Sequence, residues 1–195
     1  MAARTQQSSG SGIPFVTGTI GGAVSFVVGY LLTLIVVVAI ESGDLADDVI
    51  EATGFLYYNA QFAPIEVSVD GAGGGGGGFG SLLEQEFNYL TDSQFSQALD
   101  APSILYHLIP ILVLFLGGFA VARSVDARDI QEGAIAGATI VLGTVVLAVL
   151  GTFLFSVSNS GTTTSPVLVE GVLLVGLVFP GVLGAIGAVV RPHAG

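Results

Sequence analysis

The segment IPFVTGTIGGAVSFVVGYLLTLIVVVAI, residues 13–40, decides the fold class because it contains no charged side chain. About 20 apolar residues are enough for a helix to cross the hydrocarbon core of a bilayer, where backbone groups find hydrogen-bond partners only within the helix. This segment is longer than that minimum, so a helix over it has to tilt or to protrude from the bilayer. Residues 13–40 therefore predict a first transmembrane helix.

Three further segments have the same apolar character. Their bounds are 102–122, 133–157 and 167–190. Two start signals support these bounds: Asp100 is placed to cap the second helix, and Asp129 with Glu132 has the spacing of a capping box at the third. The sequence therefore predicts an all-α membrane protein with four transmembrane helices.

The overall composition agrees with a membrane protein. Of the 195 residues, 52% are hydrophobic and 10% are charged, and the mean hydropathy is +0.86. Four basic residues, all of them arginine, oppose 15 acidic ones, so the formal net charge is -11. Nucleic acid is excluded as a partner, because neutralising phosphates requires a basic face. The chain has no cysteine, which excludes disulfides and thiol chemistry.

The arginines set the expected orientation. With four helices, Arg4, Arg123, Arg128 and Arg191 all fall on one side, and positive charge in short loops stays in the cytoplasm. We therefore expect a multi-pass protein of the plasma membrane, with the lipid bilayer as its partner and both termini cytoplasmic. The expected cytoplasmic segments are a disordered tail at 1–12, a loop at 123–132 and a tail at 191–195. The expected external segments are loops at 41–101 and 158–166.

The 61-residue external segment 41–101 contains eleven acidic residues and no basic one. It is short for an independent hydrophobic core, so we expect it to rest on the mouth of the helix bundle. Dense acidic charge without lysine is typical of surfaces that work at molar salt, where the screening length falls to about 3 Å. A halophilic protein is therefore expected.

Periodicity within this acidic loop favours two small elements. Leu45, Val49, Ala52 and Leu56 recur at helical spacing and predict a short amphipathic helix at the membrane surface. Residues 65–70 alternate between apolar and polar like a half-buried strand, and a Gly-rich tip at 71–80 leads to a second strand around 79–83, which favours a small hairpin. An interfacial aromatic cluster is also expected. Its members are Phe55, Tyr57, Tyr58 and Phe62.

Small residues recur every four positions within the apolar segments, a spacing that lets helices approach closely in lipid. The expected helix-packing positions are Gly18, Gly22, Gly29, Gly133, Gly137 and Gly184. This pattern favours packing within one bundle, and the alternative is that it serves the contacts of a homo-oligomer or of a membrane protein partner. Pro110 and Pro180 lie near the middle of their segments and predict kinks, because each removes a backbone hydrogen bond.

Candidate functional residues are few. His107 and Glu170 lie about one turn inside the same expected membrane surface, and ionisable residues within a membrane segment indicate a functional site by default. One hypothesis is a polar pair or proton relay between them, and the other gives them structural roles or none. The chain has no HExxH motif, and the acidic residues of 44–51 lack the spacing of a calcium loop. We therefore expect no catalytic residue, no cofactor and no metal site, and the protein is predicted not to be an enzyme.

In four sequence features the chain resembles a haloarchaeal family of small four-helix integral membrane proteins of unknown function. They are Gly21-Gly22-Ala23 with Gly29-Tyr30, FLYYNAQF at 55–62, ILYHLIP at 104–110 and LAVLGTFLF at 147–155. The resemblance implies a haloarchaeal membrane location and carries over no active-site residue. The function expected is a non-enzymatic structural or interaction component of the cell membrane, and the alternative is a small transporter or channel subunit that works as an oligomer.

Overall fold

The computed structural model describes residues 13–41, 48–69, 85–97, 99–127 and 129–190. Several sequence predictions fall outside these residues. They are the disordered tail at 1–12, the tail at 191–195, the Gly-rich tip at 71–80, the second strand around 79–83, Leu45, and three of the four arginines, Arg4, Arg128 and Arg191.

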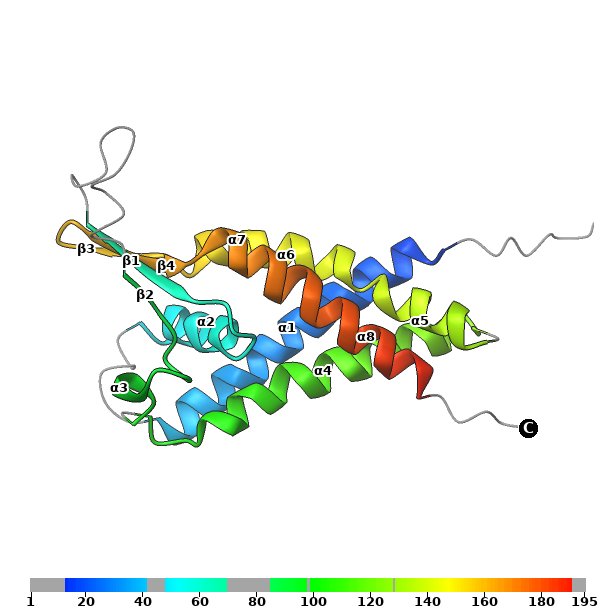
Figure 1. Ribbon diagram of the computed structural model, residues 1–195, viewed down its shortest axis with the longest axis horizontal. Helices are drawn as coiled ribbons and strands as arrows, with labels where there is room; N and C mark the ends of the chain where they lie inside the picture. The colour runs from blue at the N-terminus through cyan, green and yellow to red at the C-terminus, as the bar shows by residue number, and fades with distance from the viewer. Residues whose placement is uncertain (1–12, 42–47, 70–84, 98, 128, 191–195) are drawn as a thin grey trace, which may run out of the picture.

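Four helices in the described residues are long and apolar enough to cross a membrane. The first is α1 (Phe15–Ile40) and the second is α4 (Ser103–Ser124). The third consists of α5 (Ile130–Ala138) and α6 (Val141–Leu154), and the fourth of α7 (Leu168–Glu170), the π-helical η3 (Gly171–Val178) and α8 (Phe179–Val189). The predicted number of membrane-length segments is therefore confirmed (Figure 1).

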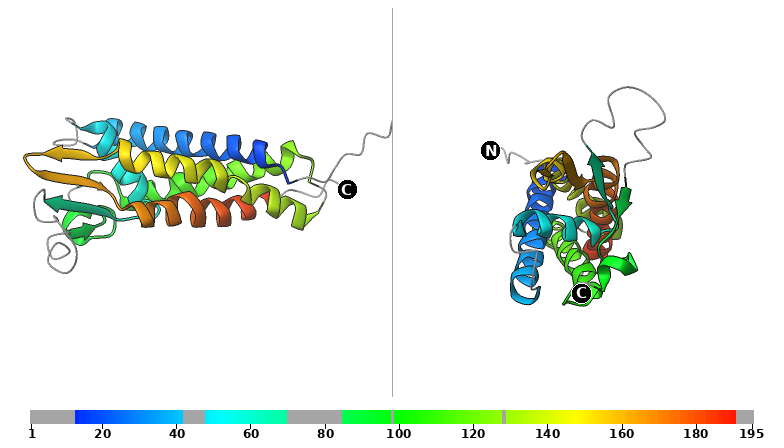
Figure 2. Two further views of the ribbon diagram at one scale, coloured as in Figure 1. Left: turned by 90° about the horizontal axis from the view of Figure 1, so that it is seen from above. Right: turned by 90° about the vertical axis from the view of Figure 1, so that its left-hand side faces the viewer.

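The four long helices form one elongated bundle, with a small sheet at one end, the sheet end (Figures 1 and 2). α1 packs against α4 and α6, while α8 packs against α4 and α5. Large apolar side chains are exposed along all four helices, for example Val16, Leu116, Phe153 and Val182, each more than half exposed. Lipid chains rather than water suit such a surface.

Of the two predicted N-terminal caps, the structure confirms the one at Asp129 and places another residue at the one predicted for Asp100. The side chain of Asp129 accepts a hydrogen bond of 2.8 Å from the N–H of Glu132, which confirms the predicted cap of α5. Pro102, and not Asp100, occupies the N-cap position of α4, which begins at Ser103. A proline holds the residue before it in an extended conformation, so the helix cannot start early enough for Asp100 to occupy that position.

Prolines and breaks modify the long helices without interrupting the bundle. α4 continues through Pro110, whereas the third membrane segment is divided at Thr139. In the fourth, Pro180 offers no N–H to the carbonyl of Gly176, four residues before it. The hydroxyl of Thr144 donates to this carbonyl at 2.7 Å. The neighbouring helix α6 therefore satisfies the group that the proline leaves unpaired.

The sheet corrects the all-α prediction. Its four antiparallel strands, in spatial order β2-β1-β4-β3, are β1 (Ile65–Val69), β2 (Gln85–Phe87), β3 (Val157–Asn159) and β4 (Thr162–Pro166). β1 was predicted as a strand, and it pairs with β2 and with β4, from Ile65 opposite Pro166 to Val69 opposite Thr162. The segment 158–166, predicted as a loop, is mostly a hairpin.

The turn between β3 and β4 explains this hairpin. Ser160 has φ of 52° and Gly161 has φ of 81°. Two residues with positive φ form the tight turn whose twist matches paired strands, and β-branched threonines at 162–164 favour the second strand. The sequence feature that could have predicted this hairpin is the pair Ser160-Gly161, which lies between β-forming residues.

α2 (Val49–Asn59) differs from the predicted amphipathic surface helix because it is buried from Ala52 onward. It packs against α1 beneath the sheet (Figure 1). Of the predicted interfacial aromatics, Phe55, Tyr57 and Tyr58 lie in the hydrophobic core, and Phe62 alone among the four is exposed, at 53%. Burial raises the pKa of the Tyr57 and Tyr58 hydroxyls, so both stay protonated, and the Tyr58 hydroxyl donates to the carbonyl of Ala148.

Candidate functional site

Several hydrogen bonds and ring contacts between distant segments lie at the sheet end. The first of them involve the turn that ends α2. The N–H of Ala63 donates to the carbonyl of Tyr58 at 3.1 Å, and that of Phe62 donates to Asn59 at 2.9 Å. Phe62 has φ of 64°, a left-handed conformation that glycine usually supplies at a helix end. The Phe62 ring stacks on His107, with centroids 4.9 Å apart. A strained backbone at this position therefore holds an aromatic ring over a histidine.

His107, predicted as half of a polar pair, bonds to the backbone. Its Nδ1 lies 2.8 Å from the carbonyl oxygen of Ala60. A carbonyl only accepts hydrogen bonds, so Nδ1 carries the proton. With Phe62 over its ring, His107 ties α4 to the end of α2.

Glu170, the other half of the predicted pair, is the last residue of α7. Its Oε2 is buried without a hydrogen-bond partner among the described residues. Within that part of the chain, no hydrogen bond or ion pair joins it to His107. The following residue, Gly171, lies against α2, since a Cβ there would be 2.9 Å from Tyr58 Cε1. The relay between the two residues remains a hypothesis.

Glu41, one of the eleven acidic residues of the segment 41–101, joins the first two membrane helices. Its Oε2 accepts from the N–H of Asp100 at 2.8 Å, and its Oε1 accepts from the N–H of Ala101 at 3.1 Å and the hydroxyl of Tyr106 at 2.7 Å. One carboxylate at the end of α1 thus fixes the entrance to α4. The partners are about 60 residues away in the chain, so no local pattern could indicate them.

A second polar network, centred on Asn59 and Asn88, fixes the chain that follows β2. Asn59 Nδ2 donates to the carbonyl of Ala63, and its Oδ1 accepts from the N–H of Tyr89, both at 2.8 Å. Asn88 Nδ2 donates to the carbonyl of Asn59 at 3.2 Å, while its N–H donates to Asp92 at 2.7 Å. Both asparagines are buried, so these bonds replace those that water would otherwise make.

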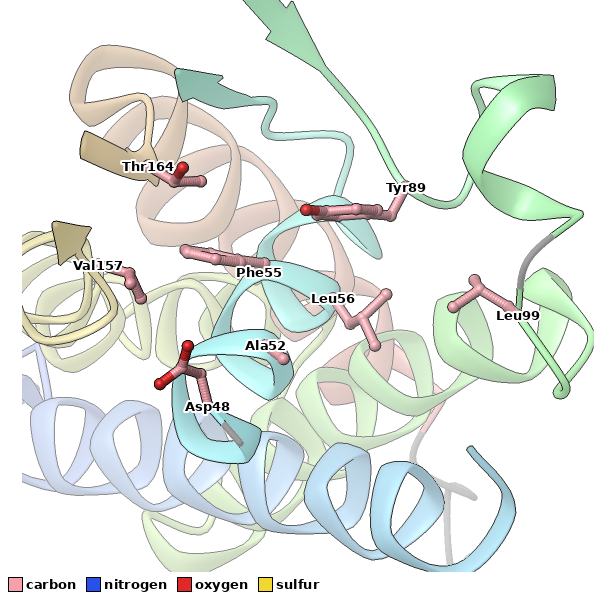
Figure 3. Close-up of a pocket in the computed structure, with 8 residues that line it drawn as sticks. All are labelled: Asp48, Ala52, Phe55, Leu56, Tyr89, Leu99, Val157 and Thr164. Atoms are coloured by element: carbon pink, nitrogen blue, oxygen red, sulfur yellow. The ribbon is translucent and has the colours of Figure 1, made fainter. Parts of the chain in front are cut away.

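These contacts leave a cavity of about 220 Å³ between α2, the two residues Tyr89 and Leu99, and the hairpin β3–β4 (Figure 3). Most of its lining is apolar. The lining residues are Asp48, Ala52, Phe55, Leu56, Tyr89, Leu99, Val157 and Thr164. Burial raises the pKa of the Tyr89 hydroxyl, which stays neutral. Asp48 is therefore the charged member of this lining, and we call the cavity the cap pocket.

One comparison with known proteins identifies a family. The model of a family of unknown function, DUF7978, matches residues 1–193. The chain belongs to this family. No curated protein and no solved structure matches the chain. The DUF7978 match spans the four membrane-length helices, the sheet and the cap pocket.

The predicted small-residue positions of this DUF7978 chain lie at contacts between its own helices. A Cβ at Gly18 or Gly22 would overlap Thr139 or Ile140, at the break between α5 and α6. Gly29 faces the Tyr57 ring. Gly133 and Gly137 face α8, where Gly184 in turn meets the carbonyl of Gly137.

No three His, Asp or Glu side chains come close enough to hold a metal ion among the residues that the structure describes. Of the acidic cluster considered for calcium, Asp44 and Asp47 lie outside those residues, and Asp48 lines the cap pocket.

Proposed function

We propose that the protein is a non-enzymatic structural or interaction component of a haloarchaeal plasma membrane. In this proposal both termini are cytoplasmic, and the sheet end, with the acidic segment 41–101, projects outside the cell. The positive-inside rule supports this orientation, because the arginines fall on the side opposite to that segment. The excess of acidic residues supports a high-salt environment.

One observation carries the proposal of a structural role: polar side chains inside the bundle are used for packing. Ser25 and Thr33 donate to carbonyls of their own helix at 2.8 and 3.0 Å, and Thr144 donates to Gly176 of the neighbouring helix. Tyr58, carried into the bundle mouth by α2, donates to the carbonyl of Ala148. The bonds of Thr144 and Tyr58 tie neighbouring helices together, whereas those of Ser25 and Thr33 satisfy their hydroxyls within α1. All four hydroxyl protons are therefore used inside the bundle and do not line a path for ions or solutes.

The alternative, a transporter or channel subunit working as an oligomer, draws on one different observation. The fourth membrane helix contains the eight-residue π-helix η3, and π-helical turns occur frequently at functional sites. Glu170, whose Oε2 has no hydrogen-bond partner among the described residues, immediately precedes η3. Carboxyl groups within membrane segments mark ion pathways and proton relays, so this position supports the alternative.

A flux assay distinguishes the two functions. Proteoliposomes containing the wild-type protein, loaded with a pH-sensitive dye and given a proton gradient at high salt, are expected to leak no faster than protein-free liposomes. Glu170→Gln and His107→Ala should behave in the same way. Flux above the protein-free control that either substitution abolishes would instead establish the transporter function.

Cysteine labelling tests the orientation, because the chain has no native cysteine that could react with the label. Ser160 lies in the β3–β4 turn and Ser124 ends α4, and both side chains are exposed. Intact cells expressing Ser160→Cys should react with a membrane-impermeant maleimide, whereas cells expressing Ser124→Cys should react only after lysis. The reverse pattern would contradict the proposed orientation.

A further inference from the structure

We propose that the cap pocket binds a small amphiphilic cation, with an ammonium group beside Asp48 and an apolar or aromatic body against Phe55 and Tyr89. This inference goes beyond the proposed structural role, since it assigns a ligand class to one cavity. It does not depend on whether the bundle transports anything.

The shape of the cap pocket favours a ligand over a packing defect. Three separate parts of the chain form its walls: α2 supplies Phe55, the segment after β2 supplies Tyr89, and the β3–β4 hairpin supplies Val157. Ligand sites in proteins are typically apolar concavities of this kind with a few polar groups. The volume of about 220 Å³ lies below the about 300–1,000 Å³ of pockets for drug-sized ligands, so the cavity suits a ligand no larger than a ring with a short substituent.

The position of Asp48 provides the second observation. Asp48 precedes α2 as its N-cap residue, where an aspartate usually accepts a hydrogen bond from the first turn of the helix. Its side chain makes no such bond and is exposed. Figure 3 shows its carboxylate on the same side of α2 as the Phe55 ring. The carboxylate therefore remains available to a cation in the pocket.

The negative charge around the pocket favours a cationic ligand over an anionic one. The segment 41–101 has eleven acidic residues and no basic one, so an anion would be repelled. Aromatic faces attract cations that have lost part of their hydration, and quaternary ammonium groups are bound in this way. A carboxylate at the pocket and two aromatic rings within it thus complement an ammonium group attached to an apolar body.

The test uses benzyltrimethylammonium as the probe and the full-length protein in lipid nanodiscs. Calorimetric titration in 1 M salt screens attraction by the general acidic surface, because the Debye length is then about 3 Å. Saturable binding is expected for the wild type and, at least tenfold weaker, for Asp48→Asn. Benzyl alcohol, which keeps the ring and lacks the charge, should also bind at least tenfold more weakly.

Two variants make the result specific. Glu86 is an exposed acid of β2 outside the pocket lining, so Glu86→Gln should change the affinity by less than about twofold, which is within about 0.4 kcal/mol. Val157→Phe fills the cavity without changing charge and should abolish binding. The proposal is overturned if wild type shows no saturable binding, if Asp48→Asn binds like wild type, or if Glu86→Gln weakens binding as much as Asp48→Asn. Circular dichroism melting curves confirm that each variant is folded.

Discussion

Replacing Gly22 with leucine is expected to lower the melting temperature of the solubilised protein by about 10 °C. The side chain would enter the space occupied by the carbonyl of Ile140, at the break between α5 and α6, and backbone on both sides prevents relief by rotation. Overpacking of this kind costs about 3 kcal/mol, and each kcal/mol shifts the melting temperature of a protein of this size by about 2–4 °C. Circular dichroism melting of the monomer in detergent measures the change.

Gly181→Leu is the matched control for Gly22→Leu. A Cβ at Gly181 would lie 3.4 Å from its nearest neighbour, the Cγ2 of Val141, which is ordinary van der Waals contact. The control should melt within about 3 °C of wild type, since this change introduces no backbone overlap. If Gly22→Leu melts like wild type but loses a crosslinked oligomer, the glycine serves self-association and the packing argument is wrong.

Glu41→Ala is expected to destabilise the protein by about 2–4 kcal/mol. The change leaves two backbone N–H groups, of Asp100 and Ala101, and the buried Tyr106 hydroxyl without their acceptor. Hydrogen bonds to a charged group contribute about 1.5–3 kcal/mol each, and partial exposure of Glu41 and Asp100 reduces the sum. Hydrogen exchange at residues 99–106 should accelerate more than exchange elsewhere in α4, because the anchor acts locally.

Two further variants show whether the loss of stability in Glu41→Ala comes from the three hydrogen bonds that Glu41 accepts. Glu41→Gln keeps one carbonyl acceptor, so its stability should fall between those of wild type and Glu41→Ala. Glu86→Ala removes a carboxylate at an exposed position on β2 and should change stability by no more than about 0.5 kcal/mol. Equal losses in Glu41→Ala and Glu86→Ala would mean that the three hydrogen bonds to Glu41 contribute nothing specific.

The membrane-length helices could be predicted because lipid imposes a local rule on sequence. A segment such as 13–40 needs only length and absence of charge to be recognised, and the cap at Asp129 follows from four adjacent residues. The buried position of α2 follows no such rule. Its apolar residues at helical spacing predicted an amphipathic surface helix, but Gly54 lies against the ring of Phe155, about 100 residues later, and the two pack in the core.

The candidate site was predicted less well than the fold, for the same reason. His107 was selected as an ionisable residue in an apolar segment, but its partner is the carbonyl of Ala60. Glu41 and Asp48 were counted among many acids of one loop. What distinguishes them is a set of hydrogen-bond donors around Glu41 and a cavity beside Asp48, and both depend on contacts between distant segments.

The order of strands in the sheet constrains how the newly made chain can mature. β1 lies between β2 and β4, so one edge of this strand has no neighbour until residues 162–166 have been synthesised. An unpaired strand edge is a template for incorrect association, and pairings distant in sequence form slowly. The four-stranded sheet can therefore close only after both halves of the chain have been synthesised. A chain truncated before β4 would leave an open strand edge that cellular proteases can recognise.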